Sequence, residues 1–317
     1  MGDNTLMATN NFKAFGIGAG ANITSQADYE SLAALLTGFQ SGKASSAQIN
    51  KALRQSSTMA YVLAQFIADS ASVDVLDNGT PATILANLKS SMTALTPGRL
   101  LNVQVFTGSG TYIPTAGTKR IKVRMVGAGG AGGGTPATSS SQIAAAFGGN
   151  SGSYAESKII DISALTSVSV TVGSAGVGVA GSPGGSGGSS AFGSYLIAPG
   201  GPGGNSGPPG AGLSIASDNV IGTASSGSSL LFGDSGSIGT GPISISSDVS
   251  SQSNFKSGKG GDSIFGGGGG GKVGGGTPRA ASGFGAGGGG SAVGPSSNLI
   301  IAGGNGSAGL VIVEEFA

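Results

Sequence analysis

The first third of the chain spaces its apolar residues as amphipathic helices do, and capping signals mark where the helices begin. Ser25 with Asp28 matches a capping box, in which side chains satisfy the free amides of the first turn. Gly38 is a typical stop signal. The apolar face between them consists of Leu32, Leu35 and Leu36. These signals predict a first helix over residues 25–39.

A second box, Ser45 with Gln48, predicts a longer helix that ends near Asp69. Its apolar positions follow a spacing close to 3-4, which Ser56 interrupts. They are Ile49, Ala52, Met59, Leu63 and Phe66. Two interpretations stay open, because so short a repeat does not establish a coiled coil. The helix is either one amphipathic member of a small bundle or a seam that associates with other copies of the chain.

A third helix is predicted to begin at Thr80, with Pro81 in the favoured first position. Its apolar residues keep helical spacing up to Leu95, and Pro97-Gly98 ends it. These apolar residues are Ile84, Leu85, Leu88, Met92 and Leu95. We therefore expect helices to dominate the chain up to about residue 97.

Beyond residue 98 the hydrophobic period changes to two, the period of a strand. Val103 and Val105 fit a first strand. Residues 121–125 fit a second, with Ile121, Val123 and Met125 on one face and Lys122 and Arg124 on the other. Residues 310–316 also read as a strand. We expect the first and last strands of this C-terminal part to lie together and close it.

Between these strands, from residue 127 onward, glycine dominates. The chain has 65 glycines in 317 residues, a share typical of low-complexity sequence. Disordered chains, however, are also poor in β-branched residues and rich in net charge. Here only 9% of residues are charged, the net charge is +1 and mean hydropathy is +0.21. Runs rich in Val and Ile interrupt the glycines at 158–162, 168–172, 298–301 and 310–313. We therefore expect an ordered domain.

Glycine contributes no side-chain burial, so such a domain must be held by backbone pairing. Polyglycine II, a left-handed helix with three residues per turn, has no Cβ atoms to hold neighbours apart and can bond laterally in several directions. Collagen needs a strict Gly-X-Y period, which the run 266–271 breaks. A weak repeat of Gly-Gly, small polar residues, an apolar residue and Gly recurs at 187–193, 260–266 and 289–294, as stacked units would. The sequence thus predicts a small α-helical region over 1–97, a β-strand connector over 98–126 and a polyglycine II-like bundle framed by β-strands over 127–317.

The missing residue types narrow the chemistry. The chain has no cysteine and no histidine, which removes disulfides, thiolate metal sites, the commonest metal ligand and the commonest general base. We expect no metal, no cofactor and no enzymatic activity. The near-zero charge argues against a nucleic-acid partner. No apolar run approaches the roughly 18 residues of a membrane span, and Asp3 and Asn4 interrupt any leader, so we expect a soluble chain without membrane insertion or a cleaved leader.

Two catalytic readings are weak. Residues 266–272 nearly match a phosphate-binding loop, but Val273 stands where the motif needs Ser or Thr, and no helix pattern follows. A glycosidase needs two carboxylates facing across a sugar, and distant residues can meet in space. The candidates are Asp161, Asp218, Asp234, Asp248 and Asp262, each in Ser- and Gly-rich surroundings where Asp is usually a turn residue.

Four segments carry unusual side chains for a glycine-rich region, and we expect them to be loops on a rigid scaffold, where binding is usually placed. They are 136–147, 199–209, 213–255 and 272–284. The candidate receptor-binding residues at their tips are Phe147, Phe255, Lys272, Arg279 and Phe284. The alternative for each phenylalanine is that its ring fills the edge of the glycine scaffold.

Several stretches resemble tailed-bacteriophage tail fibre proteins. In the N-terminal part these are 7–15, 38–46 and 50–55. Residues 106–112, 122–130, 302–304 and 311–316 resemble the glycine-rich tip domain of such fibres. Met7 would then be the usual start, with residues 1–6 as an extension.

The resemblance implies a virion protein of the tail fibre whose N-terminal part attaches to a tail or baseplate protein. It implies a homotrimer whose tip binds an outer-membrane protein or lipopolysaccharide of the host. The tip also resembles the adhesins of T-even-like phages, but those are separate chains without a tail-attachment segment, which leaves monomeric or trimeric tip geometry open. The rival interpretations are a fibre depolymerase that cleaves surface polysaccharide and an ice-binding or structural glycine-rich protein.

Overall fold

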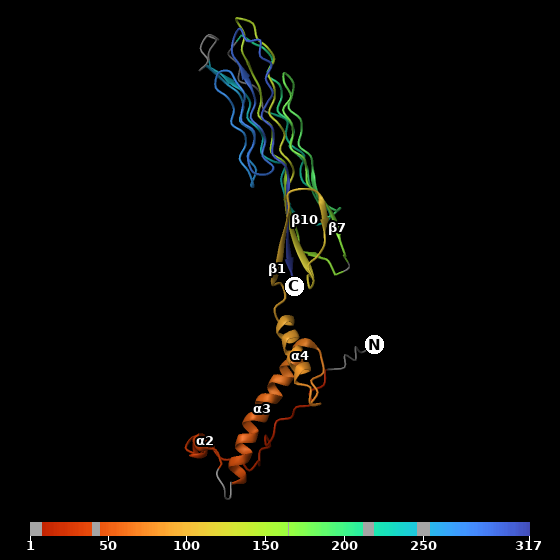
Figure 1. Cartoon of the computed structure of the whole chain (residues 1–317), viewed down its shortest axis with the longest axis vertical. Coiled ribbons are helices and arrows are strands. Elements are labelled where there is room, and N and C mark those ends of the chain that lie inside the picture. Colours follow the sequence, from red (N-terminus) through yellow and green to blue (C-terminus); the bar gives the residue numbers. More distant parts are fainter. Residues whose placement is uncertain (1–7, 40–44, 164, 212–218, 246–253) are drawn as a thin grey trace. The chain divides into compact units, whose positions relative to one another are not determined.

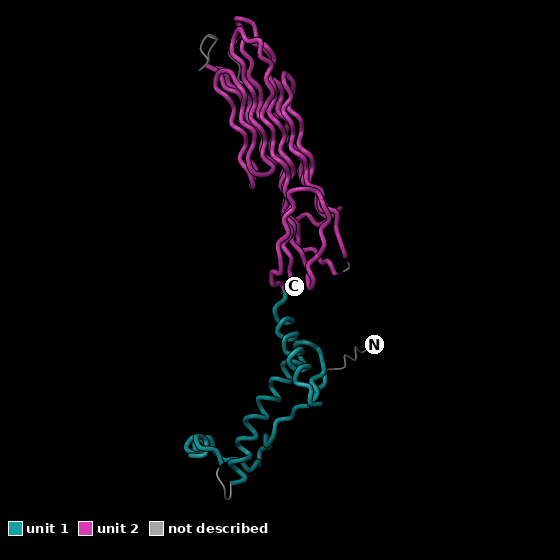
Figure 2. The backbone as a smooth tube through the Cα atoms, in the orientation of Figure 1, with its two compact units in different colours: residues 1–97 teal, residues 98–317 magenta. Residues whose placement is uncertain are grey.

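The computed structural model describes residues 8–39, 45–163, 165–211, 219–245 and 254–317. The chain forms two compact units, residues 1–97 and 98–317 (Figure 2). Residues 98–126, predicted as a connector, belong to the second unit.

The described residues of unit 1 form four helices. They are α1 (Gln26–Glu30), α2 (Ala34–Thr37), α3 (Ser46–Ala71) and α4 (Pro81–Ala94). The predicted starts of α3 and α4 are confirmed, with Ser45 and Thr80 as their N-caps. The prediction of one helix over 25–39 is wrong, because this stretch forms two short helices. The cap survives, since the Ser25 side chain accepts from the Asp28 amide, but neither α1 nor α2 buries a residue. Without packing, so short a helix does not propagate.

The core of unit 1 is small. Four buried residues form it: Ala64, Ile67, Ala68 and Val75. Phe12 and two residues of α4 pack against them, and the N-terminal segment is tied down because the Asn11 amide donates to the Val75 carbonyl oxygen at 3.0 Å. Most of the large apolar side chains of α3 therefore lie outside this core.

Unit 2 begins with two antiparallel sheets that pack face to face. The six-stranded sheet has the order β1 (Leu100–Phe106), β14 (Leu310–Phe316), β3 (Arg120–Val126), β5 (Tyr154–Ser157) and β10 (Leu230–Gly233), with β6 (Ile160–Asp161) also on β3. The four-stranded sheet has the order β2 (Gly110–Tyr112), β7 (Val168–Thr171), β8 (Ser190–Phe192) and β9 (Leu196–Ala198). The predicted pairing of first and last strands is confirmed, because β14 pairs with β1.

The core between the sheets follows from the period of two. In β3 the residues Ile121, Val123 and Met125 are fully buried, as predicted, and they pack with Tyr112 and Phe192 from the other sheet. The chain enters and leaves this sheet at one point, since the Gly98 amide donates to the Ala317 carbonyl oxygen at 3.0 Å.

A buried carboxylate lies in the same sheet. Glu315 is fully buried and accepts from the Tyr112 hydroxyl at 2.7 Å, the Thr115 amide at 3.0 Å and the Gln104 side chain at 3.1 Å. Burial acts to raise the pKa of Glu315, but the hydrogen bonds from Thr115 and Tyr112 outweigh burial and leave this pKa below its ordinary value. The burial of Tyr112 and its hydrogen bond to Glu315 raise the pKa of Tyr112.

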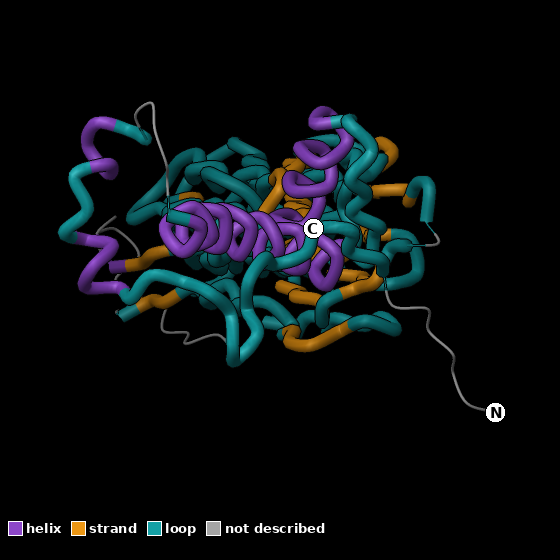
Figure 3. Tube along the Cα trace, turned by 90° about the horizontal axis from the view of Figure 1, so that it is seen from below, coloured by secondary structure: helices purple, strands orange, loops and turns teal. Residues whose placement is uncertain are grey.

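From the sheets, extended segments run out and back, side by side (Figure 1). We call them the glycine array. Its segments are 127–135, 147–153, 176–179, 182–188, 199–207, 237–240, 258–261, 267–271, 285–291 and 301–307. Most of the array carries no regular assignment and is drawn as loop in Figure 3.

Segment 127–135 is wholly buried, and its hydrogen bonds repeat every three residues. Gly127, Gly130 and Gly133 donate to segment 147–153. The residues that follow them, Ala128, Ala131 and Gly134, donate to segment 182–188. The third residues, Gly129, Gly132 and Thr135, donate to segment 301–307. Its carbonyl oxygens accept from three further segments, at Gly176, Gly201 and Gly288 among others. Six neighbours thus surround one segment, so backbone groups form the core here.

At the glycines of this core a side chain is excluded for a steric reason, and the other positions carry only Ala128, Ala131 and Thr135. A Cβ atom added at Gly132 would lie 2.0 Å from the Gly289 carbonyl oxygen, and one at Gly129 would lie 1.9 Å from that of Ala286. The segment 199–209, which we expected to be a loop, is a member of the array, because Gly201, Gly204 and Gly207 donate in turn to Ala128, Ala131 and Gly134. Its glycines at every third position were the signal for this.

Candidate functional site

The array ends in loops on the side away from the sheets (Figure 1). We call 136–142, 180–181, 208–211, 272–278 and 294–299 the far-end loops. Two of them are joined, since the Thr138 amide donates to the Ser297 carbonyl oxygen at 2.9 Å and the Ser296 amide to that of Ser139 at 2.8 Å. Below them two short ladders close the array: β4 (Ala144–Ala145) with β13 (Ala292–Val293), and β11 (Ile243–Ser244) with β12 (Phe255–Lys256). The loops therefore stand on a hydrogen-bonded base.

Two predicted binding residues remain exposed at this end. Lys272 is the first residue of the loop 272–278, and Arg279 comes directly after this loop. Both side chains are exposed. Their backbones are fixed, because the Lys272 amide donates to the Ser257 hydroxyl at 2.7 Å and the Arg279 amide to the Gly270 carbonyl oxygen at 3.2 Å. The structure thus holds two cations on either side of one far-end loop.

The three predicted phenylalanines are not at loop tips. Phe255 is only 2% exposed and packs with Ile143 and Ala292. Phe147 is half-buried within an array segment, and its amide donates to the Asn205 carbonyl oxygen at 3.1 Å. Phe284 is half-buried and pairs with Phe265. Filling the scaffold, the alternative we gave for each ring, describes Phe255 best.

Phe284 also lies away from the far-end loops. The ring of its partner Phe265 is 6.3 Å from that of Tyr154, the first residue of β5, so this pair lies near the sheets. The five predicted residues therefore do not form one site.

An exposed apolar feature was missed. Val177, Val179, Leu299 and Ile300 have 62%, 47%, 64% and 60% of their surface exposed. Their segments are neighbours, since the Gly178 amide donates to the Asn305 side chain at 2.9 Å and a Cβ at Gly181 would lie 2.9 Å from Ile300. We call these four residues the apolar edge. The sequence did mark it, because apolar residues stand among glycines there. We took such residues only as evidence that the glycine-rich region is ordered.

Titratable groups are sparse. Asp218 and Asp248 lie outside the described residues. Asp161 is exposed and accepts from the Ser163 hydroxyl and amide, which lowers its pKa. Asp234 and Asp262 line one cavity near the sheets. Within the described ranges no group of three or more acidic side chains could hold a metal ion, and no helix is long and apolar enough to cross a membrane.

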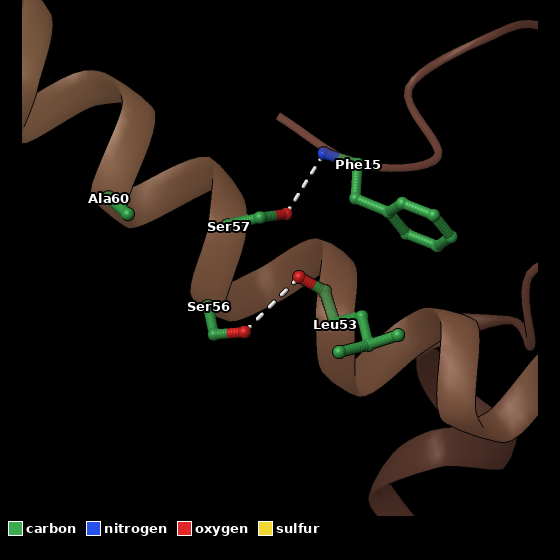
Figure 4. Close-up of a pocket in the computed structure, with 5 residues that line it drawn as sticks. All are labelled: Phe15, Leu53, Ser56, Ser57 and Ala60. Atoms are coloured by element: carbon green, nitrogen blue, oxygen red, sulfur yellow. Dashed lines mark hydrogen bonds between the residues drawn. The ribbon is translucent and has the colours of Figure 1, made fainter. Parts of the chain in front are cut away.

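Unit 1 has a separate, open apolar groove of about 330 Å³ between the N-terminal segment and α3 (Figure 4). Phe15, Leu53 and Ala60 line it together with Ser56 and Ser57. The Phe15 amide donates to the Ser57 hydroxyl at 2.9 Å, which fixes the segment on the helix.

The family model described as glycine-rich domain matches residues 104–315, about two thirds of the chain. The chain belongs to this glycine-rich domain family. The match covers both sheets and the array and does not extend into unit 1. No curated protein matches the chain.

The far-end loops and the apolar edge present a few exposed side chains on a fixed backbone. The apolar edge, Lys272 and Arg279 are held by segments whose amides are bonded to neighbours. Such an arrangement suits recognition of a surface, because loops on a rigid scaffold lose little freedom on binding.

Proposed function

We propose that this chain is a bacteriophage tail fibre protein, located in the virion, that attaches the particle to the bacterial surface without enzymatic action. The receptor would be an outer-membrane protein or lipopolysaccharide, as the resemblance implies. The observation that carries the proposal is the glycine array, a backbone-bonded scaffold that presents exposed loops and an apolar edge at the end away from its sheets.

We further propose that the array segments are polyglycine II-type helices. The three-residue repeat of hydrogen bonds along 127–135 supports this, because a threefold helix directs successive amides about 120° apart. Packing without Cβ atoms supports it too, since added Cβ atoms would overlap neighbouring carbonyl groups.

We propose that unit 1 attaches to a tail or baseplate protein and that the chain is a homotrimer. The face of α3 with Ala64, Ile67 and Ala68 is buried within unit 1. The adjacent face of α3 is not covered within unit 1. It carries the apolar side chains of Met59 and Leu63, which are 68% and 47% exposed. Covering these side chains with other copies of α3 would bury apolar area, each side chain contributing about 1.5–3 kcal/mol at full burial. Trimers also raise avidity, since linked tips rebind at high local concentration.

The test uses fluorescently labelled full-length protein and a panel of Gram-negative strains. We expect binding to a subset of strains. On such a strain the variant Leu299→Asp/Ile300→Asp should bind at least tenfold more weakly, because both side chains belong to the apolar edge.

The matched control is Ile159→Asp, since Ile159 is similarly exposed at 55% but lies beside β6 at the sheet end. Thermal melts establish that all variants are folded. Binding to no strain, or equal losses in the edge variant and the control, would refute the proposal.

A further inference from the structure

A concave feature of unit 2 lies where the array joins the sheets, away from the far-end loops. A cavity of about 220 Å³ is formed where the segments before β5, after β10 and after Lys259 meet. Its walls include Ser151, Tyr154, Asp234, Ser237, Asp262 and Ile264. A cavity this small, below the roughly 300–1,000 Å³ of drug-sized sites, admits one small ring.

Asp234 is fixed with one carboxylate oxygen unused. Its Oδ1 accepts from the Tyr154 amide at 2.7 Å and the Gly236 amide at 2.9 Å. Among the described residues, its Oδ2 and the Ser237 hydroxyl make no hydrogen bond, although both residues line the cavity. The cavity therefore offers a carboxylate acceptor next to a hydroxyl that can donate or accept.

Asp262 has a different role, because its charge is already balanced. Lys259 Nζ lies 2.8 and 2.6 Å from its two oxygens, and the Gly268 amide donates to Oδ1 at 2.7 Å. The hydrogen bond from Lys259 is the main reason that the pKa of Asp262 is lowered. The cavity keeps about one uncompensated negative charge, on Asp234. One free carboxylate is too little for a Ca²⁺ site, because Ca²⁺ takes six to eight oxygen ligands. The negative charge of Asp234 repels anionic ligands.

The remaining wall is apolar and well supported. Tyr154 packs against Phe232 and Phe265 at 6.2 and 6.3 Å between ring centroids, and its hydroxyl donates to Glu156 at 2.7 Å. Ile264 lies on the turn whose Ser263 hydroxyl donates to the Phe284 carbonyl oxygen. The backbone of Phe284 thus helps to hold this wall.

A ligand that fits has one apolar face, several hydroxyl or amino donors and no negative charge. We propose that this cavity binds a single hexose or amino-hexose unit of a bacterial surface glycan, with Asp234 and Ser237 receiving its polar groups. The proposal rests on the proposed function and adds to it a glycan-binding subsite apart from the far-end loops.

The test uses the full-length protein with glucose, galactose, glucosamine and glucuronic acid, observed by saturation-transfer NMR and titration. At least one of the first three should bind, and glucuronic acid should not. Asp234→Asn and Ser237→Ala should each weaken the binding sugar, the former about tenfold or more because charge-assisted hydrogen bonds are the stronger ones.

Asp161→Asn is the matched control, because Asp161 is an exposed carboxylate in β6 that does not line the cavity. Ser237→Ala keeps the test valid if Asp234→Asn unfolds, since the Ser237 amide, not its hydroxyl, bonds to Ser151. Binding of none of the first three sugars, stronger binding of glucuronic acid, or equal affinity in the cavity variants and the control would overturn the proposal. Bacterial binding separates the two proposals: cell binding without sugar binding refutes the subsite alone, and sugar binding without cell binding refutes the attachment function alone.

Discussion

Replacing one buried glycine of the array should destabilise unit 2 far more than replacing an open one. Gly132 lies at the centre of segment 127–135, and the ideal Cβ of an alanine there would be 2.0 Å from the Gly289 carbonyl oxygen. At Gly108, in the same unit, a Cβ would meet nothing within 4 Å. Neither position has a positive φ, so the two substitutions differ in packing and not in backbone strain.

The size of the effect follows from the contacts. Carbon atoms pack about 3.5–4.0 Å apart, so the Gly289 carbonyl must move by roughly 1 Å or more. That carbonyl accepts the Gly304 amide at 2.8 Å, a bond that such a shift would break. Overpacking costs about 1–3 kcal/mol and the lost hydrogen bond about 1 kcal/mol, so Gly132→Ala should cost about 2–4 kcal/mol. Gly108→Ala should instead be neutral or stabilise by up to about 1 kcal/mol.

The measurement is calorimetry on the full chain, following the transition of unit 2. For a domain of this size about 2–4 °C of melting temperature corresponds to 1 kcal/mol, so Gly132→Ala should lower Tm by roughly 4–16 °C. Circular dichroism before melting checks that the variant is folded. Equal Tm values for the two variants would show that backbone packing does not hold the array.

Three further predictions address other parts of the chain. Glu315→Gln should lower the free energy of unfolding by about 1–3 kcal/mol, because the amide of Gln presents donors to the donors that surround it. Since folding lowers the pKa of Glu315, the stability that its carboxylate contributes is complete above about pH 4.5 and is lost as pH falls through the folded pKa. The free energies of unfolding of variant and parent, measured by denaturant titration, should therefore converge at acid pH. If the proposed homotrimer forms through α3, Leu63→Glu should dissociate it in sedimentation velocity. Val62→Glu should not, because Val62 is similarly exposed at 52% but lies on another face of α3. Identical sedimentation of the two variants would contradict the proposed seam. Inserting one glycine between Gly134 and Thr135 should lower Tm more than inserting three, because only three preserve the repeat of donors, and equal losses would argue against threefold geometry.

The sequence predicted those elements whose side chains carry a period. The caps at Ser45 and Thr80 located α3 and α4, and alternation located β3 and β14. The helix over 25–39 failed because its signals are local, whereas its persistence depends on packing that α1 and α2 lack.

The array was harder to predict because glycine has no side chain whose polarity could show a period. Its ordered state followed from composition and charge, but the neighbours of each segment depend on backbone bonds between residues as distant as Gly129 and Ser307. The segment 199–209 was taken for a loop because it carries side chains that are unusual for a glycine-rich region. Pro202 fits there because its carbonyl oxygen, not the amide it lacks, makes the bond, to Asn150 at 3.0 Å. The cavity at Asp234 joins three segments remote in sequence, and no local motif marks it.

The position of β14 between β1 and β3 has a mechanical consequence. Two of the strands that connect directly to the array, β3 and β14, run along its direction. β14 is bonded to β1 through six residue pairs and to β3 through seven. Tension applied at the far end and resisted at Arg99 would pull these ladders lengthwise, so their hydrogen bonds would share the load together and would not open one after another. Unit 2 should therefore resist a pull along its strands at forces that would peel apart a sheet loaded across its strands.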